Sequence, residues 1–294
     1  MGKLNAYLNL LRPHQYLKNG FIWLPIIFGY RISEPGQVFL TLLAFAAFCL
    51  MSSTIYVIND FMDREEDRRH PVKKNRPLAS GAVTSREALW IGLILFGASL
   101  ALSLAGLPVA CLYLLLAYLL LNIAYSQKLK HIPIVDIVCI ALGFVLRIFM
   151  GGTAVHVPIS PWIVIMTFLL ALFLALAKRR DDLLLMDQGT LVRKAIDGYN
   201  LEFISLAMGI MASVIIVAYI LYTVSPEVVA KHGTHRLYIS GIWVLLGLLR
   251  YLQITFVEEK SGSPTLVLIK DHLLQLIIVL WLLNIFLLLY VIKG

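Results

Sequence analysis

Residues 88–127 read ALWIGLILFGASLALSLAGLPVACLYLLLAYLLLNIAYSQ, a stretch that contains no charged side chain. Because about 20 apolar residues are enough to cross a bilayer, this stretch is too long for a single transmembrane helix. The sequence Gly106-Leu107-Pro108 lies near its middle and favours a turn. The stretch is therefore predicted to form two transmembrane helices joined by a tight turn.

The composition of the whole chain also indicates a lipid environment. Of its 294 residues, 60% are hydrophobic and only 14% are charged, whereas soluble globular proteins carry roughly 25% charged residues. A soluble enzyme, a disordered protein and a secreted disulfide-linked domain are excluded. The three cysteines lie in apolar runs and act as small hydrophobic residues, so neither disulfides nor a zinc site is expected.

The apolar runs between charges and Pro/Gly breaks predict an all-α bundle of nine transmembrane helices, forming one domain over residues 1–294. The predicted spans are roughly 14–30, 37–58, 87–105, 109–126, 134–154, 161–178, 202–224, 237–257 and 272–292. The first is the weakest, because only residues 19–30 are free of charge, and eight is the nearest competing count.

The basic residues orient the predicted helices. With a cytoplasmic N-terminus, 19 of the 25 Lys and Arg residues lie in cytoplasmic segments and 4 on the other side. Positively charged cytoplasmic loops are the rule for membrane proteins, and they explain the net charge of +8 without a nucleic-acid partner. The expected location is the inner (cytoplasmic) membrane, with the N-terminus and the acid-rich loops cytoplasmic.

An acid-rich segment, NDFMDREEDRRHPVKKNRPLASG (59–81), follows the second predicted helix. If that helix continues, Asn59, Asp60, Asp63 and Asp67 share one arc of about 100°. Carboxylates on one face repel each other unless a cation lies among them, and all-oxygen ligation suits Mg²⁺, with Mn²⁺ as an alternative.

The competing interpretation of this segment is a solvated acidic helix end, neutralised by neighbouring Arg64, Arg68 and Arg69. An acidic face at a helix C-terminus opposes the helix dipole, which is negative there. We therefore favour the metal site.

A second acid-rich segment, KRRDDLLLMDQG (178–189), follows the sixth predicted helix. As a helix, it places Lys178, Asp181 and Asp182 on one arc, with Asp187 about opposite Lys178. Asp181 and Asp182 are thus candidates for metal or diphosphate binding, and Asp187 is more simply a solvated residue.

The two acid-rich segments together indicate a diphosphate site, in which acids hold Mg²⁺ while the metal and basic groups hold phosphates. The basic residues interleaved with the acids are Lys73, Lys74, Arg76, Lys178, Arg179 and Arg180. The sequence contains no nucleophilic Ser or Cys motif, no His pair at metal spacing and no Gly-rich phosphate loop.

Five segments of the sequence resemble those of one known family. They are LRPHQYLKNG (11–20), the 59–81 segment quoted above, AYSQKLKHIPIVD (124–136), GFVLR (143–147) and LALAKRRDDL (174–183). The 59–81 segment resembles the first aspartate-rich motif of the UbiA superfamily of intramembrane prenyltransferases. The five together resemble the branch of decaprenyl-phosphate phosphoribosyltransferase. The usual D-x-x-x-D second motif is not present, because Asp182 and Asp187 are five residues apart.

The resemblance implies a UbiA-like fold with an active-site cavity that opens to the cytoplasm. It implies transfer of 5-phosphoribosyl from phosphoribosyl diphosphate to a polyprenyl (decaprenyl-like) phosphate in the bilayer, with release of diphosphate. Asp60, Asp63, Asp67 and Asp182 would be the catalytic, metal-binding carboxylates, with Asn59 as an added oxygen ligand.

Other polar residues of these motifs are expected to bind substrate. Lys18 and Asn19 lie at the start of the first predicted span, and Tyr125, Lys130 and His131 lie where the fourth span gives way to the fifth. For Lys18 and Lys130, a membrane-anchoring role is an equally good interpretation.

Asp136 and Arg147 lie inside the fifth predicted span, where a charge costs about 2.5–3.5 kcal/mol on insertion scales. Eleven residues of helix separate them by about 16 Å, so they cannot pair directly. Either a functional role or partners elsewhere in the bundle is expected. Arg250 is also intramembrane and stays unassigned.

Two other functions fit the same sequence. One is transfer of a polyprenyl group from its diphosphate to an aromatic or quinone-precursor acceptor, which would use the same metal site. The other is a secondary transporter, in which Asp136, Arg147 and Arg250 would line an ion or substrate path. A homo-oligomer is compatible with each function.

Overall fold

The computed structural model describes residues 2–69, 73–187 and 198–291, and these residues form helices and no strand. Eight of the helices are long and apolar enough to cross a membrane, which confirms an all-α, multi-pass membrane protein. Internal packing divides the chain into two compact units, Met1–Ser160 and Pro161–Gly294. The prediction of one domain over residues 1–294 stays a prediction.

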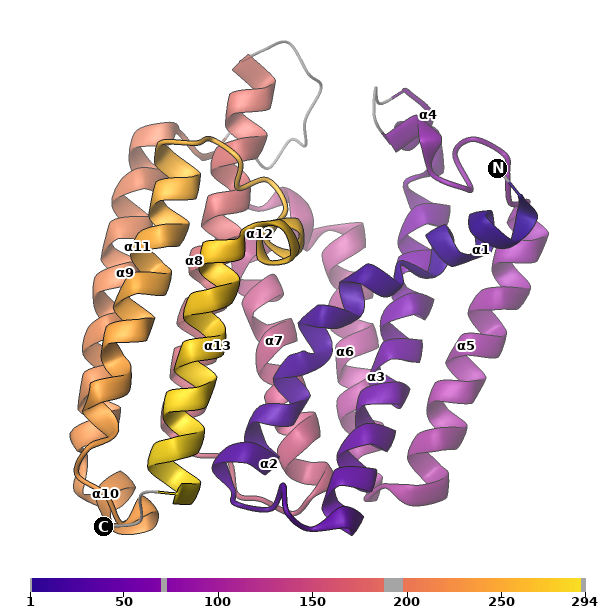
Figure 1. The fold of residues 1–294 in the computed structure, drawn as a ribbon. Helices are drawn as coiled ribbons and strands as arrows, with labels where there is room; N and C mark the ends of the chain where they lie inside the picture. Colours follow the sequence, from indigo (N-terminus) through magenta and orange to yellow (C-terminus); the bar gives the residue numbers. More distant parts are fainter. Residues whose placement is uncertain (1, 70–72, 188–197, 292–294) are drawn as a thin grey trace. The chain divides into compact units, whose positions relative to one another are not determined.

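The first unit contains seven α-helices and three short 3₁₀ helices among its described residues. They are α1 (Lys3–Leu11), η1 (Pro13–Trp23), α2 (Leu24–Phe28), α3 (Pro35–Met62), α4 (Arg64–Arg69), η2 (Lys73–Asn75), α5 (Ser85–Gly106), α6 (Val109–Gln127), η3 (Leu129–His131) and α7 (Val135–Ala154). In Figure 1, α3 and α5 run side by side, as their packing requires. Phe48 of α3 and Tyr118 of α6 pack ring to ring in the core of this unit.

The hairpin predicted from residues 88–127 is confirmed. Helix α5 ends at Gly106 and α6 begins at Val109, so the turn falls on Leu107 and Pro108. A Thr84–Glu87 capping box fixes the start of α5, because it satisfies backbone N–H groups that the first helical turn leaves unpaired.

The first predicted span, 14–30, is a 3₁₀ helix that continues into a short α-helix rather than a long α-helix. At about 2.0 Å per residue in η1 and 1.5 Å in α2, the two together extend about 30 Å, the thickness of a bilayer's hydrocarbon core. Figure 1 shows this segment descending from α1, and it packs against α3 and α7. The count of nine crossings therefore stays a prediction beside the eight long helices.

The second unit contains α8 (Pro161–Asp187), α9 (Leu201–Val224), α10 (Pro226–His232), η5 (Leu237–Ser240), α11 (Gly241–Phe256), α12 (Pro264–Lys270), α13 (His272–Phe286) and a π-helical turn, η6 (Leu287–Val291). Helix α8 packs against α9, and α11 packs against α13. Helix α8 extends well beyond the predicted end at residue 178 and carries the second acid-rich segment.

Arg250, unassigned from the sequence, joins two segments of the second unit. Its guanidinium donates to both carboxylate oxygens of Asp271, at 2.6 and 3.2 Å, and forms an ion pair with Glu258 at 2.7 Å. Asp271 also caps α13 by accepting from the backbone N–H of Leu274. These bonds give the intramembrane arginine a structural role that connects α11 with the start of α13.

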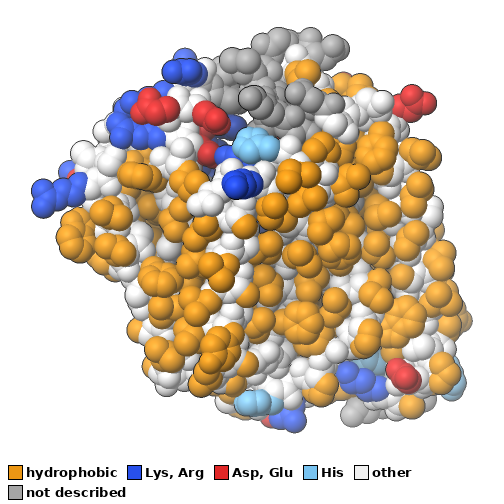
Figure 2. Space-filling model, turned by 180° about the vertical axis from the view of Figure 1, so that it is seen from behind, with side chains coloured by type: hydrophobic (Ala, Val, Ile, Leu, Met, Phe, Trp, Pro, Cys, Tyr) orange, Lys and Arg blue, Asp and Glu red, His pale blue; other side chains and the backbone are white. Residues whose placement is uncertain are grey.

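Hydrophobic side chains cover most of the face drawn in Figure 2. Among the described residues, large hydrophobic side chains that a soluble protein would bury are exposed, for example Ile94 and Leu120, each 66% exposed. An outer surface of this kind is stable against lipid chains and explains the hydrophobic composition of the chain.

Gly151 sets the contact between η1 and α7, which yields a test of the fold. A Cβ atom at this position would lie 2.1 Å from the backbone oxygen of Ile22, and a backbone cannot rotate away as a side chain can. We expect Gly151→Ala to destabilise the protein by about 1–3 kcal/mol, the usual cost of overpacking. The measurement is thermal unfolding in detergent.

Gly97→Ala is the matched control, because no atom lies within 4 Å of its Cβ position. This substitution should leave the unfolding temperature unchanged or raise it slightly, since alanine favours the helix. Equal unfolding temperatures for both variants would mean that η1 does not pack on α7 as described.

Candidate active site

The first acid-rich segment lies at the C-terminal end of α3, which is predicted to be on the cytoplasmic side. Helix α3 ends at Met62, Asp63 caps it, and α4 begins at Arg64. Backbone bonds from Asp63 N–H to Asn59 O (2.9 Å) and from Asp67 N–H to Asp63 O (2.8 Å) continue through the break. The continuous helix on which the shared arc of these residues depends is interrupted at Asp63, whose backbone (φ −89°, ψ 5°) leaves the helical region.

Asp60 and Asp67 form the first of two pairs at this end. Arg76 Nη1 donates to Asp60 Oδ1 at 3.2 Å and to Asp67 Oδ2 at 2.7 Å, and Arg12 Nη2 donates to Asp60 Oδ1 as well. The carboxylates are almost fully buried, at 1% and 3% exposure. Because a buried charge without a partner is strongly destabilising, the two arginines hold these acids in place.

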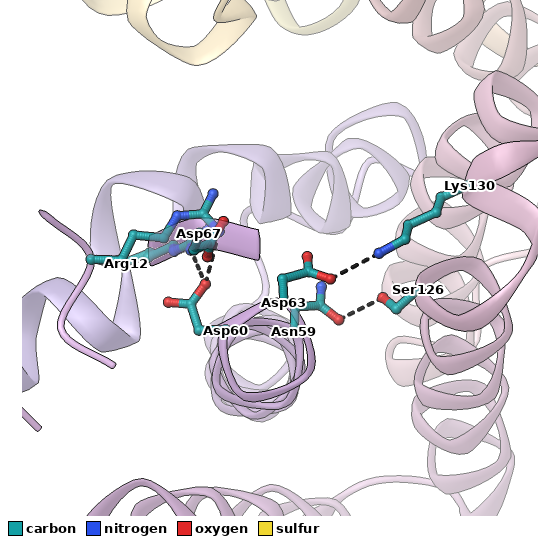
Figure 3. A network of polar contacts seen from close by, with 8 residues as sticks. Arg12, Asn59, Asp60, Asp63, Asp67, Ser126 and Lys130 are labelled. Carbon is teal, nitrogen blue, oxygen red and sulfur yellow. Dashed lines mark hydrogen bonds and ion pairs between the residues drawn. The ribbon is translucent and has the colours of Figure 1, made fainter. Parts of the chain in front are cut away.

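Asn59 and Asp63 form the second pair and face a different side of α3 (Figure 3). Ser126, near the end of α6, donates its Oγ hydrogen to Asn59 Oδ1 at 2.6 Å. Lys130 of η3 donates to Asp63 Oδ1 at 2.8 Å and is itself buried. The structure thus brings Lys130, predicted to bind phosphate, onto the predicted metal-binding acid Asp63.

The cations that neutralise these acids are not the ones that the competing interpretation named. Arg64 bonds to Ser85 and lies near Glu65, and Arg68 pairs with Glu65. The partners are Arg12, Arg76 and Lys130, of which only Arg76 belongs to the 59–81 segment. Sequence reasoning missed Arg12, although it belongs to the LRPHQYLKNG motif and lies directly before Pro13.

The backbone of Arg12 is itself unusual. It adopts the left-handed conformation (φ 53°, ψ 55°), which residues other than glycine rarely occupy. This conformation ends α1 and begins η1, and the guanidinium lies 5.1 Å from the centre of the Tyr56 ring. Such strain persists where surrounding contacts hold it, here the bond to Asp60.

The donors at the end of α3 fit a divalent cation in their chemistry. All are carboxylate or amide oxygens, the ligands that Mg²⁺ prefers, and Asp60 Oδ2 is buried without a hydrogen-bond partner. Within the described residues, no three Asp, Glu, His or Cys side chains form a ready cage. Mg²⁺ sites in proteins commonly use only one or two carboxylates together with substrate phosphates.

Asn19 and Arg147, both predicted to bind substrate, bond to each other in the buried interior of the first unit. Arg147 donates from Nε to Asn19 Oδ1 at 2.8 Å, from Nη2 to the Tyr118 hydroxyl at 2.8 Å and from Nη1 to Gly143 O at 2.7 Å. The rings of Phe48, Tyr118 and Phe144 lie about its guanidinium at 4.9–5.2 Å. These contacts connect η1, α6 and α7.

The remaining predicted residues of the first unit lie in separate places. Asp136 is fully buried in the first turn of α7, where the helix dipole favours a carboxylate. Lys18 in η1, Lys73 in η2 and Tyr125 in α6 are half-buried, and His131 in η3 is exposed. Their roles in substrate binding stay predictions.

Residues 178–187 of the second acid-rich segment lie within α8, so the helical geometry expected for this part is confirmed. The buried Arg179 donates to Asp182 Oδ2 one turn away, at 2.7 Å. Lys178 is exposed, and the side chain of Asp187 lies outside the described residues. The metal-binding role of Asp182 stays a prediction.

A loop that sequence reasoning did not single out packs on this part of α8. Ser261 Oγ donates to Ala177 O at 3.2 Å, and Arg180 donates to Thr255 O at 2.8 Å. A Cβ at Gly262 would lie 1.9 Å from Asp181 Oδ2, so a larger residue there would require the Asp181 side chain to move. The sequence signal is the polar run EEKSGS (258–263) between two apolar segments.

The Arg147 contacts distinguish a structural role from substrate binding. We expect Arg147→Lys to lose at least about 2 kcal/mol of stability, because lysine cannot reproduce three directed hydrogen bonds and leaves buried partners unpaired. Thermal unfolding in detergent measures the loss, and Arg31→Lys at an exposed ion pair is the control. Unchanged stability with lost activity would instead favour the substrate-binding role.

Comparisons with known proteins agree with the predicted resemblance. A model of the UbiA prenyltransferase family matches residues 22–268. Decaprenyl-phosphate phosphoribosyltransferase of Corynebacterium glutamicum is 29% identical over 286 residues, covering 94% of this chain and 84% of that protein. The protein of the same name from Mycobacterium tuberculosis is 27% identical over 276 residues, covering 92% and 90%.

Solved structures show the same fold. A UbiA homolog from Archaeoglobus fulgidus, bound to DMAPP and Mg²⁺, superposes with a TM-score of 0.71 at 21% identity and covers 98% of this chain and 100% of that chain. The predicted UbiA-like architecture is thereby confirmed. Since the family model matches most of its length, the chain belongs to the UbiA prenyltransferase family of membrane transferases.

Proposed function

We propose that the protein transfers the 5-phosphoribosyl group of phosphoribosyl diphosphate to a polyprenyl phosphate and releases diphosphate. The observation that carries this proposal is the similarity, over 94% of the chain, to a protein named decaprenyl-phosphate phosphoribosyltransferase. The acids and cations at the end of α3 support it, because they suit a metal-bound diphosphate.

The chemistry requires one bond to form and one to break. An oxygen of the lipid phosphate attacks carbon 1 of the ribose, and the bond from that carbon to the diphosphate oxygen breaks. The acceptor phosphate is already ionised at neutral pH, so a general base is not required. The transition state resembles an oxocarbenium ion with negative charge growing on the leaving diphosphate, and fixed positive charge is the main source of catalysis.

The chain's own cations provide that positive charge. Lys130 is held at 2.8 Å from Asp63, and Arg76 bridges Asp60 and Asp67. Because their acidic partners fix them in position before substrate arrives, little reorganisation is needed during the reaction. Lys130 thus orients and stabilises the diphosphate end of the donor, and the charge of Arg76 adds to the positive field at the same end of α3.

Asn59, Asp60, Asp63 and Asp67 would hold Mg²⁺ in this proposal. The bound ion would offset charge on the diphosphate, as divalent metals do for phosphoryl oxygens. The donor is soluble and the acceptor lies in the bilayer, so we place the N-terminus and the end of α3 on the cytoplasmic side of the inner membrane.

The rival function is prenyl transfer to an aromatic acceptor. Its support is the shared fold with a homolog bound to DMAPP and Mg²⁺. The same oxygen ligands would serve both donors, so the identity of the donor decides between the two functions.

A labelled-donor assay on purified protein in lipid decides the donor. With ribose-labelled phosphoribosyl diphosphate, a polyprenyl phosphate and Mg²⁺, we expect label to enter the lipid fraction. EDTA should stop the transfer and added Mg²⁺ should restore it, because the acids alone cannot offset the diphosphate charge. Absence of labelled lipid, together with prenylation of an aromatic acid, would establish the rival function.

Asp63→Asn tests the acidic cluster. It removes one charge at nearly constant shape, and we expect turnover to fall about 10²–10³-fold, the typical effect of removing one preorganised electrostatic group. Glu65→Gln is the matched control, because Glu65 is an exposed acid in the same segment that pairs with Arg68. Near-normal turnover in Asp63→Asn, with normal expression, would contradict the assignment.

A further inference from the structure

A polar cavity of about 320 Å³ lies beside Asp60, and most of its lining residues take no part in the mechanism above. Its lining consists of Asn9, Arg12, His14, Asp60, Asn75 and Arg76, with Pro77 as the apolar member. We call it the Arg12 pocket. Figure 3 shows Arg12 and Lys130 approaching the end of α3 from different sides, so this pocket is distinct from the Asp63–Lys130 contact.

The Arg12 pocket offers donors that suit a phosphate group. The bonds to Asp60 and Asp67 engage one terminal nitrogen of each arginine, Arg12 Nη2 and Arg76 Nη1. A guanidinium carries five N–H donors in a planar fork, so each arginine can hold its aspartate and bind phosphate oxygens as well. His14 and Asn75 are exposed at the same cavity and add further polar groups.

The pocket also contains an acceptor that no protein group satisfies. Asp60 Oδ2 is buried and has no hydrogen-bond partner among the described residues. The terminal torsion of an aspartate is broad, so a small rotation would turn this oxygen toward the cavity. A hydroxyl group of a bound sugar would then donate to one lone pair of this oxygen, which removes the cost of an unpaired buried acceptor and leaves the other lone pair for the proposed metal.

The size and polarity of the Arg12 pocket favour a phosphorylated sugar over a prenyl chain as its ligand. The cavity volume lies at the small end of the range for ligand sites, about 300–1,000 Å³, and suits a compact phosphorylated sugar. A prenyl chain would lie against two arginines and an aspartate there, with Pro77 as the one apolar lining residue, and would desolvate these charges without compensation.

We propose that the Arg12 pocket binds the ribose and the 5-phosphate of the donor, while the Asp63–Lys130 side receives its diphosphate. This inference rests on the proposed function. Phosphoribosyl diphosphate carries phosphate at both ends of a sugar, and the end of α3 has cations on two sides. The second phosphate is the feature that distinguishes this donor from a prenyl diphosphate.

A phosphate monoester could also come from the lipid acceptor, so the test uses separate probes. Phosphoribosyl diphosphate, ribose 5-phosphate, inorganic diphosphate and dimethylallyl phosphate are titrated, with Mg²⁺ present, into purified protein in lipid nanodiscs. The variant is His14→Ala, because His14 is exposed at the pocket. His235→Ala, at an exposed histidine of the second unit, is the matched control.

We expect His14→Ala to lower the affinity for ribose 5-phosphate about tenfold, which is the effect of losing one charge-assisted hydrogen bond. The affinity for inorganic diphosphate should change less than about twofold. Arg12→Lys should also lower the affinity for ribose 5-phosphate selectively, since lysine keeps the charge beside Asp60 but lacks the planar set of N–H donors of a guanidinium. Thermal unfolding of both variants shows whether they are folded.

Three results would overturn the inference. Unchanged affinity for ribose 5-phosphate in both variants, or equal weakening of ribose 5-phosphate and diphosphate, would show that the pocket does not bind the sugar end. A selective loss of affinity for dimethylallyl phosphate in these variants would assign the pocket to the lipid acceptor. If the unaltered protein binds neither ribose 5-phosphate nor phosphoribosyl diphosphate, the proposed function itself fails.

Discussion

Buried carboxylates at the end of a membrane helix require cations, and this requirement organises the first unit. Asp60 and Asp67 are almost entirely removed from water, and neither could stay ionised there alone. Their cations come from outside the acid-rich helix: Arg12 follows α1, and Arg76 follows η2. Lys130, in η3, forms an ion pair with Asp63. Segments distant in sequence are thus held against one helix end by charge.

The interior charge of Arg147 is stabilised by a different means. Its described hydrogen bonds go to an amide oxygen, a hydroxyl and a backbone carbonyl, and aromatic rings lie about its guanidinium. Neutral dipoles and ring faces can hold a cation in a low-dielectric interior when every direction is covered. Because Asn19 is one of those partners, this arrangement fixes η1, the same element whose first turn follows Arg12.

The membrane helices could be predicted from sequence because hydrophobicity and Pro/Gly breaks are local signals. The α5–α6 turn at Leu107-Pro108 is an example. The ion-pair partners of the acids could not be predicted from sequence, because Arg12 and Asp60 are 48 residues apart and Lys130 and Asp63 are 67 apart. Arg64 and Arg68, which are close in sequence, were the expected ion-pair partners of these acids. In the folded chain the partners are instead Arg12, Arg76 and Lys130. The Gly262 contact with Asp181 likewise depends on a fold that brings two distant segments together.

Charge balance supports the proposal that this site binds a metal and a diphosphate together. Asp60, Asp63 and Asp67 are matched by Arg12, Arg76 and Lys130, so the described cluster is close to neutral before substrate arrives. A divalent cation alone would leave excess positive charge in a poorly solvated place, and a diphosphate alone would lie against three carboxylates. Bound together they nearly cancel, and the acids and cations can exchange partners without creating an unpaired buried charge. Metal and donor should therefore favour each other's binding, which is what a transferase needs to keep diphosphate bound until the acceptor phosphate attacks.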